Sequence, residues 1–380
     1  MKRPFKLKTF LSVLQVCVVV LSVCSCSNSD EPESPEPRTL SMYLDGTVYS
    51  KGVLTDGEGI FEDYYELSKQ VPENPVSVTL ENAGTLSDAL AGKTEGMDAL
   101  KVSGPMNKAD LRYVAEYVKQ NYLISLDLSL AQFSDNTIPD RAMEITIGRE
   151  YFSSNSIGEI CAGLPVFHLI LPKNLQKIGT AAFAGLMIMD LELPESLKHI
   201  GKSCFLGNTI GDGELVIPNG VTTIPSDAFC SYQYSAQPVR SLTRIVLPQS
   251  VTTVENNAFR SVQAKELELG NGIKEIGAYA FFNNHAIEIL ELPSSLKSID
   301  SGAFADLSAL TDIYSYNSTP PDAENSSPYH NGIYAFNCYN SSCVYCSNVY
   351  QRITLHVPAG RRDAYRAAPV WSQFQKISEQ

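Results

Sequence analysis

The sequence lacks the short motifs that mark most enzyme active sites. It contains no G-x-S-x-G nucleophile elbow and no H-E-x-x-H zinc motif, and its five histidines are scattered along the chain. Gly201-Lys202-Ser203 suggests a phosphate-binding loop, but Ser196 stands five residues before Gly201, where that motif needs glycine. We therefore expect no enzyme, no cofactor and no bound metal.

Positive charge is also scarce. The 380 residues carry 29 Lys and Arg against 42 Asp and Glu, so the formal net charge is −13. Phosphate groups need a basic surface, so these numbers argue against nucleic acid or an anionic membrane as an electrostatically bound partner. The 44% hydrophobic content nevertheless allows a sizeable core, which excludes a disordered chain.

The apolar run near the N-terminus is too short to span a bilayer comfortably. It has about 14 residues and follows four basic residues within the first eight, which is typical of an export signal. The small residue before Cys26 resembles the lipobox of bacterial lipoproteins, in which the cysteine is lipidated once the preceding signal peptide, here residues 1–25, is removed. Cys24 is the alternative, but Ser25 suits the cleavage site better than Val23.

An acidic, proline-rich segment follows, and we predict a tether over residues 26–40. Its Asp30 and Glu31 resemble the surface-export signal of lipoproteins from the Bacteroides group, which implies an outer-membrane protein exposed on the cell surface. The alternative is an anchor that faces the periplasm. Removal of residues 1–25 deletes four positive charges, so the mature net charge becomes −17.

One pattern, LxLPxxLxxIGxxAF, recurs six times and accounts for most of residues 126–316. Its turn position is occupied by Pro172, Pro194, Pro218, Pro248, Gly270 and Pro293. Three positions later stand Leu175, Leu197, Val221, Val251, Ile273 and Leu296, and six positions later Ile178, Ile200, Ile224, Val254, Ile276 and Ile299. Eleven positions later stand Phe183, Phe205, Phe229, Phe259, Phe281 and Phe304. All variation in repeat length falls between each Phe and the next strand.

Each copy is too small to bury its own apolar side, so the copies must stack into one continuous core. We predict a repeat solenoid, a right-handed coil that is rich in strands, has short helical turns and is capped at both ends. In the second copy Leu191 and Leu193 should point inward and Glu192 outward, and Cys204 takes a slot that the other copies give to alanine. The polar residues of this copy then face solvent.

The pattern resembles the BspA-type leucine-rich repeats of bacterial surface proteins. A degenerate earlier copy places Met143 at the Phe position, and another copy ends near Leu164. The flanks resemble the family as well, with a lead-in over residues 41–125 that contains a helix near 108–119, and a cap over residues 317–380 with a turn at Pro358. Trp371, the only tryptophan, is expected to plug the last coil.

The outward strand positions are the first candidate for a binding surface. Two residues before each turn stand Ile170, Glu192, Val216, Val246, Glu268 and Glu291, and His356 continues this row at the cap. Six strands would form a ribbon about 25 Å long, adequate for a protein loop, a peptide or a glycan. The alternative is that these positions are aliphatic only because aliphatic residues favour strands.

The insert loop with Tyr232 and Tyr234 is a second candidate for a binding surface. The alternative is that this loop only varies in length and sequence, as surface loops commonly do.

Three cysteines near the C-terminus, Cys338, Cys343 and Cys346, leave several possibilities open. Because an export route is oxidising, a disulfide within the trio is favoured. Unpaired thiols and a metal site with nearby histidines remain alternatives.

The resemblance implies a lipid-anchored, surface-exposed protein that binds host or microbial surface proteins as an adhesin does. A glycan-binding accessory lipoprotein is the main alternative, although no aromatic platform is expected among the outward strand positions. A structural envelope component without a soluble ligand is the third.

Overall fold

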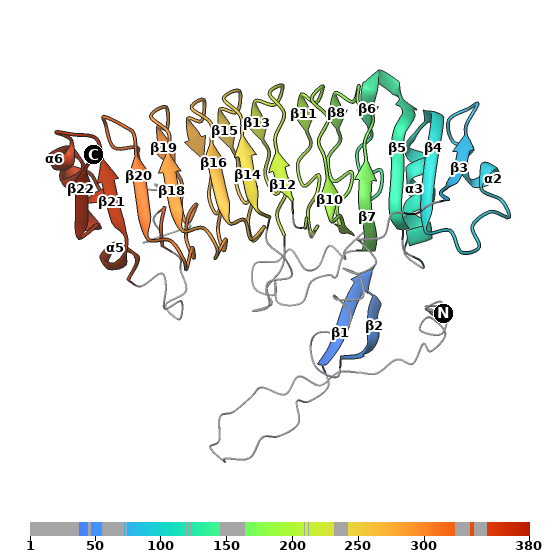
Figure 1. The fold of residues 1–380 in the computed structure, drawn as a ribbon, viewed down its shortest axis with the longest axis horizontal. Coiled ribbons are helices and arrows are strands. Elements are labelled where there is room, and N and C mark those ends of the chain that lie inside the picture. The colour runs from blue at the N-terminus through green and yellow to red at the C-terminus, as the bar shows by residue number, and fades with distance from the viewer. Residues whose placement is uncertain are drawn as a thin grey trace, which may run out of the picture.

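The computed structural model describes residues 38–44, 47–54, 72, 74–118, 121, 123–144, 164–208, 210–211, 213–231, 242–323, 335–337 and 348–380. Coils of similar shape follow one another along a single axis, with the C-terminus at one end of the row (Figure 1). This arrangement confirms the repeat solenoid.

Each coil contributes one strand to each of two rows of parallel strands, called the longer and the shorter ladder, and each row consists of several separately hydrogen-bonded sheets. The longer strands are β7 (Leu164–Ile170), β10 (Asp190–Leu191), β12 (Glu214–Val216), β14 (Arg244–Leu247), β16 (Glu266–Leu269) and β18 (Ile289–Leu292). The shorter strands are β6 (Thr137–Ile138), β8 (Lys177–Ile178), β11 (His199–Ile200), β13 (Thr223–Ile224), β15 (Thr253–Val254), β17 (Glu275–Ile276) and β19 (Ser298–Ile299). They form a second row in Figure 1.

The repeated Pro or Gly produces the turn between the two ladders. The N–H of Leu197 donates to the carbonyl of Pro194 over 2.9 Å, and Val221 and Pro218 repeat this bond at 3.0 Å. The remaining copies make it as well. The turn returns the next apolar residue to the core, so Leu197, Val221 and their equivalents are fully or almost fully buried.

The repeated phenylalanines form the Phe ladder, which consists of Phe183, Phe205, Phe229, Phe259, Phe281 and Phe304. Successive ring centroids lie 5.3–5.5 Å apart with nearly parallel planes. Phe336 extends the stack at 6.1 Å, and Trp371 packs edge-on against Phe336. The buried indole donates its N–H to the carbonyl of Pro321. Trp371 therefore plugs the last coil, as predicted.

A left-handed residue stands two positions before each phenylalanine. Ser203 has a φ of 54° and Tyr279 of 56°, and the other copies adopt similar values. In the first five copies the N–H of this residue bonds to the following coil, and in all six the N–H of the phenylalanine does so, which gives a third set of hydrogen bonds between the coils. Short turns with hydrogen bonds between residues three apart do form here, as from the N–H of Cys204 to the carbonyl of Gly201 at 3.2 Å, and the positive φ keeps them from continuing as helices. Among the described repeat coils, a 3-10 helix is present only at Ser134–Asn136, in the degenerate copy.

The N-terminal flank continues the parallel sheet. β3 (Val76–Thr79), β4 (Ala99–Met106) and β5 (Leu123–Phe133) precede β7, with α2 (Leu86–Ala89) and α3 (Lys108–Val118) in the connections. The predicted helix is confirmed, and its apolar residues are buried. The buried Asp110 accepts hydrogen bonds from the backbone N–H groups of Gly84, Leu86 and Asn107, which joins both connections. β1 (Arg38–Leu44) and β2 (Thr47–Leu54) form an antiparallel hairpin.

The degenerate first copy is also confirmed. Met143 is fully buried, and its N–H donates to the carbonyl of Ala182, as a phenylalanine would at this position. The degenerate copy contributes β5 and β6, which pair directly with β7 and β8 of the first regular copy. The two copies are therefore neighbours in the stack. The further copy expected to end near Leu164 falls largely outside the described residues.

β20 (Asp312–Ser315) is the last strand within the predicted repeats, and the C-terminal flank adds β21 (Thr354–Val357) and β22 (Lys376–Glu379) to the longer ladder. Between them lie α5 (Val349–Arg352), α6 (Arg362–Ala367) and a 3-10 turn at Trp371–Gln373. The expected turn at Pro358 is present, because its carbonyl accepts the N–H of Arg361 at 3.0 Å. The parallel sheet thus extends past both ends of the predicted repeats, and the domain boundaries stay predictions.

Candidate binding face

The strand face is formed by the outward side chains of the longer strands from β7 to β21, together with Glu192 directly after β10. Register pairs Val216 with Val246 and Val246 with Glu268, and Leu169 with Leu191, which brings Ile170 beside Glu192. Glu291 occupies the same alternating position in β18, and all these strands follow one another in the longer row of Figure 1, so the six predicted residues share one face. Five are exposed and Val246 is half-buried. Their role in binding stays a prediction.

The strand face carries an aromatic residue that sequence analysis missed. In β20, Ile313 is buried and Tyr314 points outward, in register with Glu291 on one side and His356 on the other. The expectation of a face without aromatic side chains is wrong. Tyr314 was missed because its strand ends in Ser315-Tyr316 in place of Leu-Pro, although the alternation around Ile313 is the same as in the other strands.

Tyr314 belongs to a polar cluster at the C-terminal end of the strand face. Its ring stacks on that of His356, with centroids 4.2 Å apart and planes 7° from parallel. His356 Nε2 lies 2.7 Å from Asp312 Oδ1, and this hydrogen bond is the main cause that lowers the pKa of Asp312. Tyr316, 43% exposed, follows directly after β20. Burial raises its pKa, and the nearby Glu291 adds to the effect. The cluster offers aromatic surface and hydrogen-bonding groups to a ligand.

Arg244 joins three strands at the centre of the face. Its guanidinium lies 3.2 Å from Glu214 on β12 and 3.2 Å from Glu268 on β16. The hydrogen bond to Glu214 is the main cause that raises the pKa of Arg244. The positive charge of Arg244 is thus neutralised by two carboxylates, next to the aliphatic side chains of Val216 and Val246.

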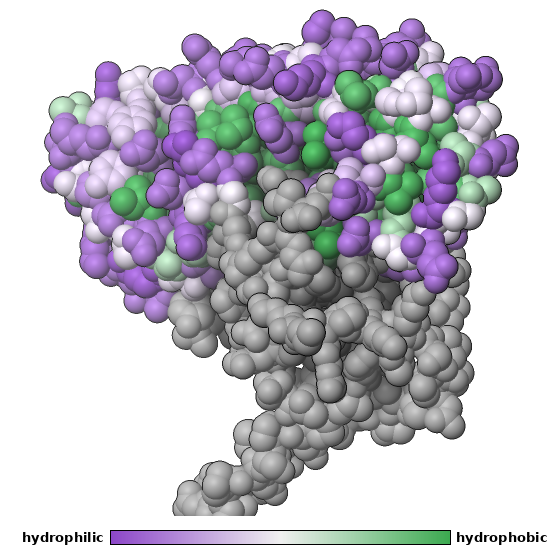
Figure 2. Space-filling model, turned by 45° about the vertical axis from the view of Figure 1, so that its right-hand side comes forward, coloured by the Kyte–Doolittle hydropathy of each residue, from purple (hydrophilic) through white to green (hydrophobic). Residues whose placement is uncertain are grey.

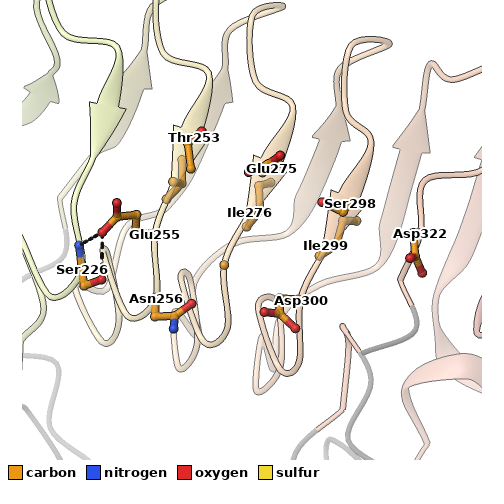
Figure 3. A pocket seen from close by; sticks show the side chains of 12 residues that line it. Ser226, Thr253, Glu255, Asn256, Glu275, Ile276, Ser298, Ile299, Asp300 and Asp322 are labelled. Carbon is orange, nitrogen blue, oxygen red and sulfur yellow. Dashed lines mark hydrogen bonds between the residues drawn. The ribbon is translucent and has the colours of Figure 1, made fainter. Parts of the chain in front are cut away.

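The shorter ladder borders a polar groove of about 440 Å³ that the sequence did not reveal (Figure 3). Glu255 Oε2 accepts hydrogen bonds from the backbone N–H and the hydroxyl of Ser226, each 2.9 Å long. Glu275, Asp300 and Asp322 line the rest of the groove. These residues come from separate coils, so no local motif could have identified the groove. Among the described residues no group of three or more His, Cys, Asp or Glu could hold a metal ion.

Several predicted residues lie outside the described part of the chain. They are the lipidation candidate Cys26, the loop residues Tyr232 and Tyr234, and the cluster Cys338, Cys343 and Cys346. Cys204 and Cys230 are described, and both are free and buried. Burial raises the pKa of both thiols, that of Cys230 to about 12. Cys204 packs in the core, as its alanine slot predicted.

None of the described helices has the length and hydropathy needed to cross a membrane. The surface shows hydrophobic patches set among hydrophilic side chains (Figure 2). The five large hydrophobic side chains that are most exposed among the described residues are Leu130, Ile170, Val216, Ile289 and Tyr316. Three of them lie on the strand face and Tyr316 directly follows it.

Comparison with solved structures finds several repeat proteins of low sequence identity. A leucine-rich repeat protein from Bacteroides ovatus is 13% identical, with a TM-score of 0.39, over 92% of this chain and 79% of that one. A leucine rich cell surface protein from Faecalibacterium prausnitzii is 18% identical, with a TM-score of 0.28. That match covers 47% of this chain and spans about half, 50%, of the other. The pneumococcal vaccine antigen PcpA is 14% identical, with a TM-score of 0.30, over 75% of this chain and 74% of its own.

No curated protein matches the sequence. The model of the BspA type leucine rich repeat region, in contrast, matches with six copies over residues 147–238 and 233–354. These ranges span more than half of the chain and coincide with the coils that carry the Phe ladder. The protein therefore belongs to the BspA type leucine-rich repeat family.

Proposed function

We propose that this protein is a lipid-anchored, surface-exposed binding protein that recognises a protein of a host or microbial surface through the strand face, as an adhesin does. One observation carries the proposal. The strand face exposes Ile170 at 44%, Val216 at 49% and Ile289 at 51%, while the inward residues of the same coils are buried. Exposed aliphatic side chains bordered by polar ones are typical of protein interfaces.

Strand formation alone does not explain these aliphatic residues. Glu268 in β16 occupies the position equivalent to Val216, and Glu266 in β16 and Thr354 in β21 occupy the position equivalent to Ile289. Both strands pair without a register shift. Polar residues are therefore compatible with the same backbone. The ladders also hold the face rigid, so a partner would bind with little loss of conformational entropy.

The purified full chain should be screened against matrix proteins and a glycan array in parallel. We expect matrix-protein hits that weaken about tenfold in Val216→Ser. Binding to glycans alone would overturn the adhesin proposal. Binding to neither the matrix proteins nor the glycans would favour a structural envelope component.

Lipid anchoring is tested separately. Cys26→Ala should abolish metabolic labelling with a fatty acid in the producing cell. Labelling that persists in Cys26→Ala but disappears in Cys24→Ala moves the anchor to Cys24. Labelling that persists in both variants refutes the anchor. Protease accessibility on intact cells distinguishes the surface from the periplasm-facing alternative.

Glycan binding is a second candidate because the strand face does carry aromatic side chains. Tyr314 stacks on His356, and Tyr316 is exposed beside Glu291. Aromatic rings with hydrogen-bonding neighbours suit a sugar. Tyr316→Ala should then abolish glycan-array signals, while Val216→Ser should leave them unchanged.

A further inference from the structure

The charges of the described coils are divided unevenly between the strand face and the rest of the surface. Between Leu164 and Ala323 the strand face holds six carboxylates with described side chains, Glu192, Glu214, Glu266, Glu268, Glu291 and Asp312. Its only lysine or arginine there is Arg244. The remaining described surface of these coils carries eight acidic and eight basic residues. The negative charge of this region is therefore concentrated on the strand face.

Contacts within the face do not remove this excess. Arg244 is already bound to Glu214 and Glu268, so it adds no free positive charge. Asp312 is paired with His356. Glu192 and Glu266 remain exposed, with Val216 between them in the strand order. The face thus alternates exposed carboxylates with exposed aliphatic side chains.

From this pattern we propose that the strand face binds a basic protein segment that carries aliphatic side chains between its lysines or arginines. This inference rests on the proposed function and adds the chemistry of the partner. Ammonium or guanidinium groups would pair with the carboxylates, and the aliphatic side chains would cover Ile170, Val216 and Ile289. Complementary charge also speeds association and excludes acidic partners.

The first test uses three synthetic peptides of about twelve residues, alternating Lys and Val, Glu and Val, or Lys and Ser, with the full chain. We expect the Lys-Val peptide to bind best and to weaken at least about tenfold between 150 and 500 mM NaCl, because salt screens exposed charges. The Glu-Val peptide should not bind. Equal binding of the Lys-Val and Glu-Val peptides would overturn the proposal.

Matched variants separate a local effect from the net charge. Glu192→Lys with Glu266→Lys reverses two charges on the strand face, and Glu195→Lys with Glu275→Lys reverses two exposed charges outside it. We expect the first pair alone to weaken Lys-Val binding at least about tenfold. If both double variants lose the same amount of Lys-Val binding, the effect depends only on the net charge of the protein and the proposal is refuted. The double Glu→Gln variant at 192 and 266 repeats the test if the lysine variant does not fold.

A peptide array that tiles the matrix proteins distinguishes this proposal from the proposed function. We expect its hits to be rich in Lys and Arg and to require Glu192 and Glu266. Neutral or acidic hits that weaken in Val216→Ser would refute the basic partner while the protein-binding function stands. Hits insensitive to every strand-face variant would refute both.

Discussion

The Phe ladder and the strand face come from the same coils, yet they differ in how strictly the sequence repeats. All six positions of the Phe ladder hold phenylalanine, and the ring spacing varies only between 5.3 and 5.5 Å. The outward positions of the strand face hold aliphatic, acidic and aromatic residues in no fixed order. Both regions share one backbone period.

The difference follows from what each side chain touches. Inside, each ring is enclosed by its neighbours above and below, so a smaller residue leaves a cavity and a larger one clashes. Outside, a side chain borders water, and many residues satisfy that position. In this protein a residue type is therefore repeated in every coil where the side chain is packed, and it varies where the side chain borders water.

The largest expected effect is a break in the Phe ladder. Phe229 is 1% exposed and stacks on Phe205 and Phe259, both 5.3 Å away. Phe229→Ala should lower the free energy of unfolding by about 3–5 kcal/mol, since the cavity opens between coils that cannot collapse independently. Urea unfolding followed by circular dichroism measures it. A loss below about 1 kcal/mol would show that the ladder does not hold the coils together.

The left-handed position next to the ladder repeats in backbone conformation but not in residue type. Gly302 has a φ of 61°, and a Cβ there would lie 2.6 Å from the ring of Tyr279. Gly302→Ala should therefore cost about 1–3 kcal/mol through strain and overpacking. Ser203, at the same position four coils earlier, is the control: Ser203→Gly should stabilise by about 0.5–1 kcal/mol. Thermal unfolding of both variants measures the contrast, and effects of one sign would contradict it.

Substitutions on the strand face should leave stability almost unchanged. Val216 is 49% exposed, so Val216→Ser should change the free energy of unfolding by no more than about 0.5 kcal/mol. The same variant should weaken partner binding about tenfold. Urea unfolding and a binding titration separate the two effects. A large loss of unfolding free energy in Val216→Ser would show that the strand face, like the Phe ladder, is needed for stability.

The smallest effect is a pH dependence at the end of the face. Because the hydrogen bond from His356 lowers the pKa of Asp312, the carboxylate stabilises the folded state at neutral pH. This contribution is lost as the pH falls below about 4 and through the lowered pKa. Asp312→Asn should remove it, so its melting temperature should decline slightly less than that of the natural protein between pH 5 and pH 3. An identical decline would show that the pair contributes nothing.

Much of the fold was predictable because each element repeats a local rule. The turn at every Pro or Gly, the inward Leu, Ile and Phe, the helix near residues 108–119 and the plug at Trp371 follow from alternation, turn chemistry and the need to cover an apolar end. The early end of the short turns in the repeat coils was not predicted. It depends on a left-handed residue at each coil, occupied by Ala, Ser, Asp, Asn, Tyr or Gly, which gives no common sequence signal.

The candidate surface was predictable only in part. The sequence alone determined which residues alternate outward along each repeated strand, because strand geometry has a period of two. Only the tertiary structure decided that Tyr314 and His356 stack beside that row, that Arg244 is held between Glu214 and Glu268, and that a groove opens over the shorter ladder. Such contacts join residues more than twenty positions apart in the sequence. Their distances are set by the stacking of whole coils, which no local pattern encodes.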